Sequence, residues 1–305
     1  WYLGMSTDSG RLVHEPVMTA ELVTMLEPNR GGQFLDCTVG TGGHARALFE
    51  AGAARVIGID RDQESLPLAA ATLTPWTEHV ELIHSDFRNI DLLLDERQIM
   101  TVDGALADLG MSSVQLESEG RGFSFRRDDP LDMRMDRSSG PTAEEMLREV
   151  SEAALADCIF QYGEERYARR IARAIVATRR RQPLTSTAQL ANLVREVVPR
   201  RRGQRIDPAT RTFQALRIWV NRELEGLDQF LRRVCHRLRA GARLGVITFH
   251  SLEDRVVKHV LRELERGHDI GLRVLTKRPL RPGPAEVTRN PRARSAKLRV
   301  AERLA

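Results

Sequence analysis

Residues 33–60 read QFLDCTVGTGGHARALFEAGAARVIGID, and this stretch decides the fold class. Residues 33–38 and 55–60 are apolar enough to be buried strands. Between them lie a Gly-rich turn at residues 40–43 and a helical pattern over residues 44–52. A strand, a tight turn, a helix and a second strand predict the start of a parallel α/β sheet.

Further candidate strands and helices alternate along the chain. Strands are expected at residues 80–84, 102–108 and 244–249, with a closing pair at 272–276 and 297–302. Helices are expected at residues 17–27, 63–73 and 252–266, and Pro67 should disturb the first turns of the second. This alternation predicts a Rossmann-like, doubly wound sheet with right-handed crossovers.

The alternation is interrupted after Asp108. Residues 111–141 are rich in Gly, Ser, Asp and Arg and are predicted to form a loop. Helical periodicity follows, with expected helices at residues 143–149, 152–162, 165–180 and 186–198. We therefore expect an all-helical domain, residues 116–209, inserted between two segments of the sheet domain, residues 1–115 and 210–305. A helix over residues 210–238, broken near Gly226, should lead back to the sheet.

The Gly-rich turn is the candidate cofactor site. Glycine suits positions where φ is positive or where a ligand approaches the main chain closely. The helix N-terminus near His44 offers unpaired N–H groups. Asp60 ends the second strand, 20 residues after Gly40, where an acid can accept hydrogen bonds from both ribose hydroxyls. Together these features indicate an adenine-nucleotide type of ligand.

The spacing of the glycines narrows the cofactor. The G-T-G-G pattern places the third glycine too early for a dinucleotide site. The chain has no Gly-Lys-Ser/Thr motif, which argues against an NTPase. Asp36, at the end of the first strand, suits a ligand with an ammonium group, which favours S-adenosylmethionine. Phe87 follows the third strand, where it either lies against the adenine or packs in the core. Asp108 and Ser112 leave the fourth strand at the crevice, facing the methyl group.

Charge distribution points to a polyanionic partner. Residues 161–210 and residues 273–305 each carry a net +8, so the rest of the chain carries −11 against a total of +5. Two basic blocks on an acidic chain favour nucleic acid, the alternative being solvated Arg-rich faces. Four arginines fall on one helix face, which either tracks phosphates or only solubilises the helix: Arg166, Arg169, Arg170 and Arg173.

Several other residues admit two roles each. Phe123 and Phe125 either stack on a splayed base or pack within their loop. His250 either contacts RNA or, as we favour, acts locally at the following helix start. An acidic run (Asp128, Asp129, Asp132 and Asp136) is expected to face solvent or arginines such as Arg127 and Arg134, and no metal is expected. The three separated cysteines, and the lack of a membrane-spanning or signal segment, predict a cytoplasmic protein.

Longer motifs resemble the bacterial 16S rRNA cytidine N4-methyltransferases, the RsmH or MraW family, from about Val13 to the C-terminus. The first half of the resemblance is carried by residues 14–18 (HEPVM), 42–44 (GGH), 108–113 (DLGMSS), 121–125 (RGFSF) and 130–136 (PLDMRMD). The second half is carried by residues 162–166 (YGEER), 210–218 (TRTFQALRI), 249–255 (FHSLEDR) and 290–295 (NPRARS).

The resemblance implies a class I methyltransferase sheet interrupted by a helical domain. It implies methylation of N4 of a decoding-centre cytidine, position 1402 in the usual rRNA numbering, in the assembled small ribosomal subunit by a monomer or homodimer. Carried over by motif, the cofactor contacts are Gly42, Gly43, His44, Asp60, Phe87, Asp108 and Gln115. Asp36 is then expected to brace the turn.

Asp108 is also the candidate catalytic residue. It either orients the amine and receives its proton, or only binds the cofactor. Two other classes of function are considered: a ribosome-assembly factor that retains a cofactor pocket, and a DNA amino-methyltransferase. The intact Gly42, Gly43, His44, Asp60 and Asp108 set argues against the first. The absence of an Asn/Asp/Ser-Pro-Pro-aromatic motif after the fourth strand argues against the second.

Overall fold

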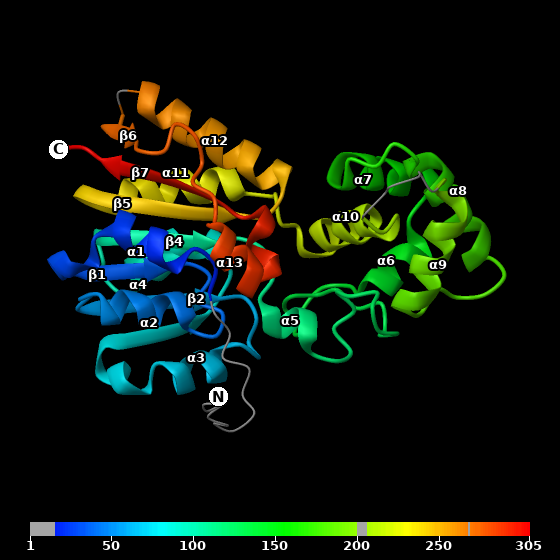
Figure 1. Ribbon diagram of the computed structural model, residues 1–305, viewed down its shortest axis with the longest axis horizontal. Coiled ribbons are helices and arrows are strands. Elements are labelled where there is room, and N and C mark those ends of the chain that lie inside the picture. Colours follow the sequence, from blue (N-terminus) through cyan, green and yellow to red (C-terminus); the bar gives the residue numbers. More distant parts are fainter. Residues whose placement is uncertain (1–15, 200–205, 268) are drawn as a thin grey trace, which may run out of the picture.

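A seven-stranded sheet organises one half of the molecule (Figure 1). The computed structural model describes residues 16–199, 206–267 and 269–305, so residues 14 and 15 of the first family motif lie outside it. The strands are β1 (Gln33–Asp36), β2 (Arg55–Asp60), β3 (Val80–His84), β4 (Val102–Asp108), β5 (Leu238–Thr248), β6 (Leu272–Val274) and β7 (Lys297–Arg303). Their order is β3-β2-β1-β4-β5-β7-β6. The predicted Rossmann-like α/β fold is confirmed.

Strands β1 to β5 pair in parallel, whereas β7 runs antiparallel to both β5 and β6. The expected closing pair of strands is therefore confirmed. Strand β5 starts six residues before the predicted strand, at Leu238 in place of Leu244. Residues 239–241 in the first part of β5 are exposed, so this part lacks the run of apolar residues by which a buried strand is predicted. The sequence therefore indicated only the buried second part of the strand.

Helices cover both faces of the sheet, as a doubly wound fold requires. One core lies under α1 (Thr19–Leu26), α2 (Gly43–Glu50) and α3 (Leu66–Thr72). The other lies under α4 (Ile90–Glu96), α11 (Leu227–Arg237) and α12 (Ser251–Arg266). Helix α3 begins three residues later than predicted, with Pro67 in its first turn. Proline is tolerated there because the N–H groups of the first turn have no partner within the helix. The short helices α4, α5 (Ser113–Glu117) and α13 (Pro284–Arg289) were not predicted.

The helical region forms a second body beside the sheet (Figure 1). It contains α6 (Ala143–Glu149), α7 (Glu152–Gly163), α8 (Ala168–Arg179), α9 (Thr187–Val197) and α10 (Ala209–Asn221). Their buried side chains share one core, which also takes in Leu131 and Met133 of the preceding loop. None of the helices in the described part of the chain is long and apolar enough to cross a membrane.

Helix α10 belongs to the helical region, although the division at residue 210 assigned it to the sheet. Its side chains Ala209, Phe213 and Leu216 are buried in the helical core. The expected break near Gly226 is confirmed, because Gly226 adopts a φ of 69° between α10 and α11. The chain therefore changes bodies between Asn221 and Leu227.

Candidate functional site

A cleft lies at the carboxyl ends of β1, β2 and β4, where open α/β sheets bind ligands. It encloses about 1210 Å³, including its opening to solvent. Residues 37–41 of the turn and residues 108–112 after β4 form two of its walls. Most of the expected cofactor contacts line it: Gly43, His44, Asp60, Phe87, Asp108 and Gln115.

Gly42, the seventh expected contact, does not line the cleft. It is the N-cap residue of α2, with a φ of 85° that L side chains rarely adopt. A Cβ at this position would lie 3.2 Å from the Leu73 side chain and 3.3 Å from Ala69 Cα. Gly42 therefore shapes the turn and lets it pack closely on α3.

Two aspartates hold the Gly-rich turn from below. Asp60 accepts hydrogen bonds from the Gly40 N–H at 2.7 Å and the Asp62 N–H at 2.8 Å, and burial raises its pKa to about 6. Asp36 is fully buried, does not line the cleft, and accepts the Thr38 N–H at 3.1 Å. Burial raises the pKa of Asp36 to about 7 against that hydrogen bond, and the charge of Asp60 adds to the rise. Asp36 thus braces the turn.

Asp108 faces His44 across the cleft. The Asp108 Oδ2 lies 3.8 Å from His44 Nδ1, and His44 Nε2 bonds the Val17 carbonyl at 2.9 Å. Because a carbonyl only accepts, Nε2 carries a proton. Asp108 Oδ1 is buried and has no hydrogen-bond partner among the described residues. Burial, followed by the charges of Asp36 and Glu253, raises the pKa of Asp108 well above its ordinary value. Asp108 therefore brings a carboxylate with a raised pKa to the cleft wall.

Phe87 and Gln115 border the cleft while packing elsewhere. The Phe87 ring lies 4.4 Å from the Phe230 ring, so it belongs to the sheet core as well as to the cleft wall. The Gln115 amide oxygen accepts the Ser112 N–H at 3.0 Å, and its nitrogen donates to Asp62 at 2.7 Å. Gln115 thus ties the segment after β4 to the segment after β2.

A buried arginine, to which sequence reasoning gave no role, joins the same network. Arg121 is 3% exposed and donates to Asp62 at 2.9 Å and to the Met135 carbonyl at 2.8 Å. Asn221 completes the link, accepting the Met135 N–H at 2.7 Å and donating to the Met133 carbonyl at 2.7 Å. The only sequence signal was the 121–125 motif, which gives no hint of its partners.

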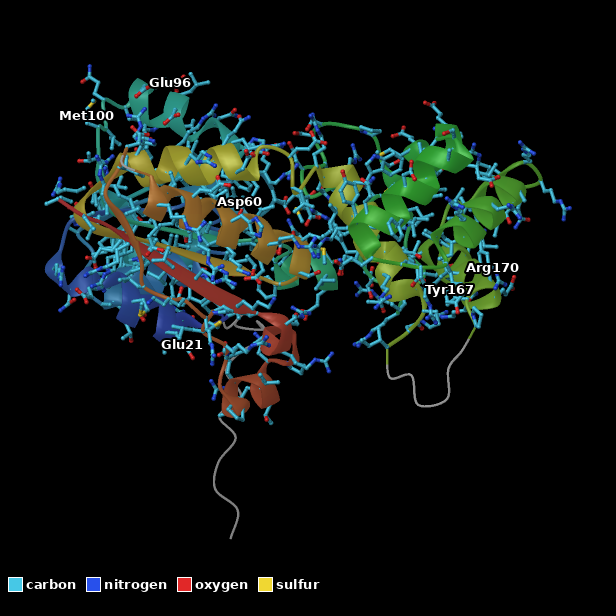
Figure 2. The ribbon with its side chains drawn as sticks, turned by 90° about the horizontal axis from the view of Figure 1, so that it is seen from above. Glu21, Asp60, Glu96, Met100, Tyr167 and Arg170 are labelled. Atoms are coloured by element: carbon cyan, nitrogen blue, oxygen red, sulfur yellow. The ribbon has the colours of Figure 1, made fainter. Side chains whose placement is uncertain are left out.

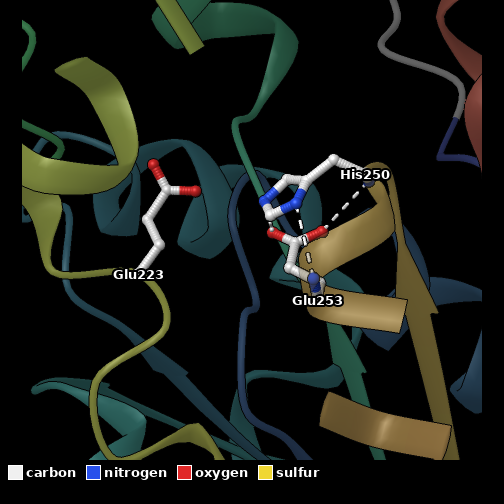
Figure 3. A group of neighbouring side chains, drawn as sticks. All are labelled: Glu223, His250 and Glu253. Carbon is white, nitrogen blue, oxygen red and sulfur yellow. Dashed lines mark hydrogen bonds and ion pairs between the residues drawn. The ribbon is translucent and has the colours of Figure 1, made fainter. Parts of the chain in front are cut away.

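Four ionisable side chains, which we call the charged wall, bound the cleft on the side of the helical region: Arg217, Glu223, His250 and Glu253. Figure 3 shows the last three. Arg217 donates to both Glu223 oxygens, at 2.8 and 2.7 Å. Burial raises the pKa of Glu253, but the adjacent His250 ring, the charge of Arg217 and the Phe249 N–H bring it below its ordinary value. Sequence reasoning missed Arg217, Glu223 and Glu253.

His250 caps α12, so the local role favoured from the sequence is confirmed. Its Nδ1 accepts the Glu253 N–H at 3.4 Å, and Glu253 accepts the His250 N–H in return. Ligand atoms of Glu223, His250 and Glu253 lie within 4.8 Å of one another, a spacing that a metal ion could use. Both carboxylates already have partners in the structure. Glu223 pairs with Arg217, and Glu253 accepts two backbone N–H groups.

The acidic run bonds mainly to local groups. Arg134 pairs with both Asp132 oxygens, at 2.8 and 3.0 Å, as the sequence suggested. Arg127 differs from expectation, because it donates to the carbonyls of Leu116 and Ser118. Asp129 and Asp136 accept the N–H groups of Gly120 and Ser138, whereas Asp128 accepts that of Ala188, which is distant in the sequence.

The arginine face lies on the helical region, away from the cleft. All four of its arginines are exposed: Arg166, Arg169, Arg170 and Arg173. The Tyr167 ring lies 4.7 Å from the Arg166 guanidinium and 5.9 Å from that of Arg170. Figure 2 shows Tyr167 and Arg170 toward the outer end of the helical region and Asp60 in the sheet body. Any ligand that contacts both places must be large.

Comparisons with known proteins identify the family of the chain. The model of the MraW methylase family matches residues 11–304. Ribosomal RNA small subunit methyltransferase H of Cyanothece sp. is 52% identical over 293 residues, covering 96% of this chain and 95% of the relative. The Thermotoga neapolitana protein of the same name is 50% identical and covers 95% of both chains. A solved rRNA methylase from Streptococcus thermophilus superposes with a TM-score of 0.42 at 12% identity, with 94% of each chain covered. The chain belongs to the MraW methylase family, and S-adenosylmethionine is its methyl donor.

Proposed function

We propose that the protein methylates N4 of a cytidine in the decoding centre of 16S rRNA, at position 1402 in the usual numbering, within the assembled small subunit. Its relatives are named as small-subunit rRNA methyltransferases, which supports rRNA as the substrate class. We also propose that the helical region is a substrate-recognition domain and that the protein acts in the cytoplasm, where the subunits are.

The residues of the cleft fit S-adenosylmethionine. Each Asp60 oxygen accepts one hydrogen bond from a backbone N–H. The remaining lone pair on each oxygen can accept a hydrogen bond from a ribose hydroxyl. Gly40 leaves the main chain of the turn open to the ligand, Gly43 lines the cleft beside Pro16, and Phe87 offers an apolar wall for the adenine. His44 and Gln115 complete the proposed set. When bound, the cofactor supplies an electrophilic methyl group.

The observation that carries the proposal is the Asp108 carboxylate, which lines the cleft with 22% of its side chain exposed. An exocyclic amine is a poor nucleophile because its lone pair is delocalised into the ring. The exposed part of the Asp108 carboxylate can accept a hydrogen bond from the amine, which holds the nitrogen in line for attack. Once the nitrogen is alkylated its proton becomes acidic, and Asp108, whose pKa burial raises, takes it. Fixing two groups in reacting geometry lowers a barrier by up to about 7–11 kcal/mol in favourable cases.

The arginine face is proposed to bind RNA phosphates at a distance from the reacting base. Arg166, Arg169, Arg170 and Arg173 are exposed, and Tyr167 stacks beneath two of them. The distance of this face from the cleft suits a folded rRNA substrate, which can span both bodies of the protein.

Isotope labelling tests the proposed reaction. The protein is incubated with methyl-labelled S-adenosylmethionine and small subunits that lack the modification, and the label is mapped by mass spectrometry. Label on N4 of the decoding-centre cytidine is expected. Label on a carbon, on a ribose oxygen or on another base would contradict the proposal, and no transfer at all would favour a binding role.

Asp108→Asn separates the two roles of Asp108. The amide keeps the size of the side chain but cannot take the proton. Cofactor affinity should change little, whereas single-turnover methylation should fall by about 10²-fold or more, as for loss of a general base. Loss of cofactor affinity with an unchanged rate at saturation would show that Asp108 only binds the cofactor.

A further inference from the structure

A second pocket adjoins the cleft on the side of the helical region. Four aromatic rings line it, from the loop, from α10 and from the end of β5: Phe123, Phe125, Phe213 and Phe249. We call it the aromatic pocket. It encloses about 710 Å³, including its opening, and shares Met111 and Phe249 with the cleft. A ligand in this pocket would therefore lie next to the proposed position of the methyl group.

The charged wall separates the two spaces. Arg217 and His250 line the aromatic pocket, whereas their partners Glu223 and Glu253 line the cleft. Each ion pair thus crosses the wall, with its cationic or imidazole end in the aromatic pocket and its carboxylate end in the cleft. Figure 3 shows Glu223 projecting toward His250 and Glu253 from a separate segment.

The pocket side of the wall presents hydrogen-bond donors. Arg217 gives Nε–H and one Nη2–H to Glu223, which leaves three of the five N–H groups of a guanidinium. His250 Nδ1 accepts the Glu253 N–H, so the neutral ring carries its proton on Nε2. That Nε2 is buried and lies 2.9 Å from Glu253 Oε1, so it faces Glu253, and the donors open to a ligand are those of Arg217.

We propose that the aromatic pocket holds the acceptor base, flipped out of the RNA, and that Arg217 selects cytosine over uracil. Cytosine presents O2 and N3 as acceptors, which match the donors on the wall. Uracil instead carries N3–H, which would oppose them. With O2 and N3 on the wall, the neighbouring N4 amine points past it toward Asp108. This assignment rests on the proposed function.

Aromatic rings give the base its stacking surface. Phe125 packs edge-on against Phe213, with ring centroids 4.8 Å apart, and Phe125 is only partly buried. Stacking of one base on an aromatic side chain changes affinity by roughly 5- to 150-fold. Phe125→Leu and Phe213→Leu keep apolar volume but remove the rings, so each should raise the half-saturating subunit concentration by about fivefold or more.

Phe160→Leu is the matched control, because Phe160 is exposed on α7 and does not line the pocket. Single-turnover methylation is measured against subunit concentration at saturating S-adenosylmethionine, and cofactor affinity is measured separately. If F213L does not fold, F125L carries the test. A shift in F125L smaller than fivefold relative to F160L overturns the assignment. Failure of the wild-type protein to methylate subunits would instead refute the proposed function.

Base selection is tested with Arg217→Gln/Glu223→Gln, which replaces the ion pair without leaving one charge buried alone. Small subunits carrying uridine at the acceptor position serve as competitive inhibitors of methylation. The wild-type protein should bind cytidine subunits more tightly than uridine subunits, by roughly 5- to 150-fold for a good paired contact. The double variant should lose most of this ratio, an effect that a purely structural pair would not produce. An unchanged ratio overturns the role of Arg217.

Discussion

Replacing Asp36 with Asn tests whether burial controls the ionisation of the turn. The Asp36 side chain is fully buried, and its Oδ2 has no hydrogen-bond partner among the described residues. Burial raises its pKa from 3.8 to about 7. At 1.36 kcal/mol for each pKa unit, the ionised carboxylate lowers the stability of the folded protein by about 4 kcal/mol relative to the acid.

The sign of the effect follows from the direction of the shift. Because the folded pKa of Asp36 lies above the unfolded one, its stabilising contribution is complete below about pH 3.8 and is lost as the pH rises through about 7. About 2.5 kcal/mol of this loss falls between pH 5 and pH 8. The D36N amide stays neutral, and its oxygen can still accept the Thr38 N–H. The free energy of unfolding of D36N should therefore rise relative to that of the wild type as the pH rises.

Urea denaturation without cofactor, at several pH values between about 5 and 8, gives the free energy of unfolding of both proteins. Asp157→Asn is the control, because Asp157 is exposed on α7. The difference between D36N and the wild type should grow with pH, whereas that for D157N should stay nearly constant. A pH-independent difference for D36N, or one that shrinks as the pH rises, would refute the reasoning.

Three further predictions concern the links between the two bodies and the RNA surface. Asn221→Ala removes buried hydrogen bonds to Met133 and Met135 and should cost about 2–3 kcal/mol in urea denaturation; no loss would mean that water replaces the side chain. Arg121→Met leaves the Asp62 carboxylate buried without its partner and should cost about 3–5 kcal/mol, part of which R121M/D62N should recover. Arg166→Gln/Arg170→Gln should make the salt dependence of rRNA binding shallower by about 1.4–1.8 in the log–log slope, measured by filter binding; an unchanged slope would remove both from the phosphate contacts.

Much of the sheet could be predicted from the sequence because its signals are local. Buried strands and amphipathic helices repeat over a few residues, and the Gly-rich turn demands backbone conformations that only glycine adopts readily. The structure also brings Gly40 and Asp60 together, as their spacing indicated, because Asp60 accepts the Gly40 N–H. The short helices α4 and α13 escaped prediction, although α6, which also has seven residues, was predicted.

Neighbours across the chain, by contrast, were decided only by the tertiary structure. Arg217 and His250 lie 33 residues apart in the sequence, and the fold places them on one pocket wall. The burial that makes Asp36 and Asp108 basic depends on every segment packed around them. The sequence by itself determined the sheet, the turn and the family, because those depend on local pattern and motif. The pKa values of the carboxylates depend on desolvation, and the aromatic pocket depends on contacts between distant segments. No local sequence pattern encodes either of these.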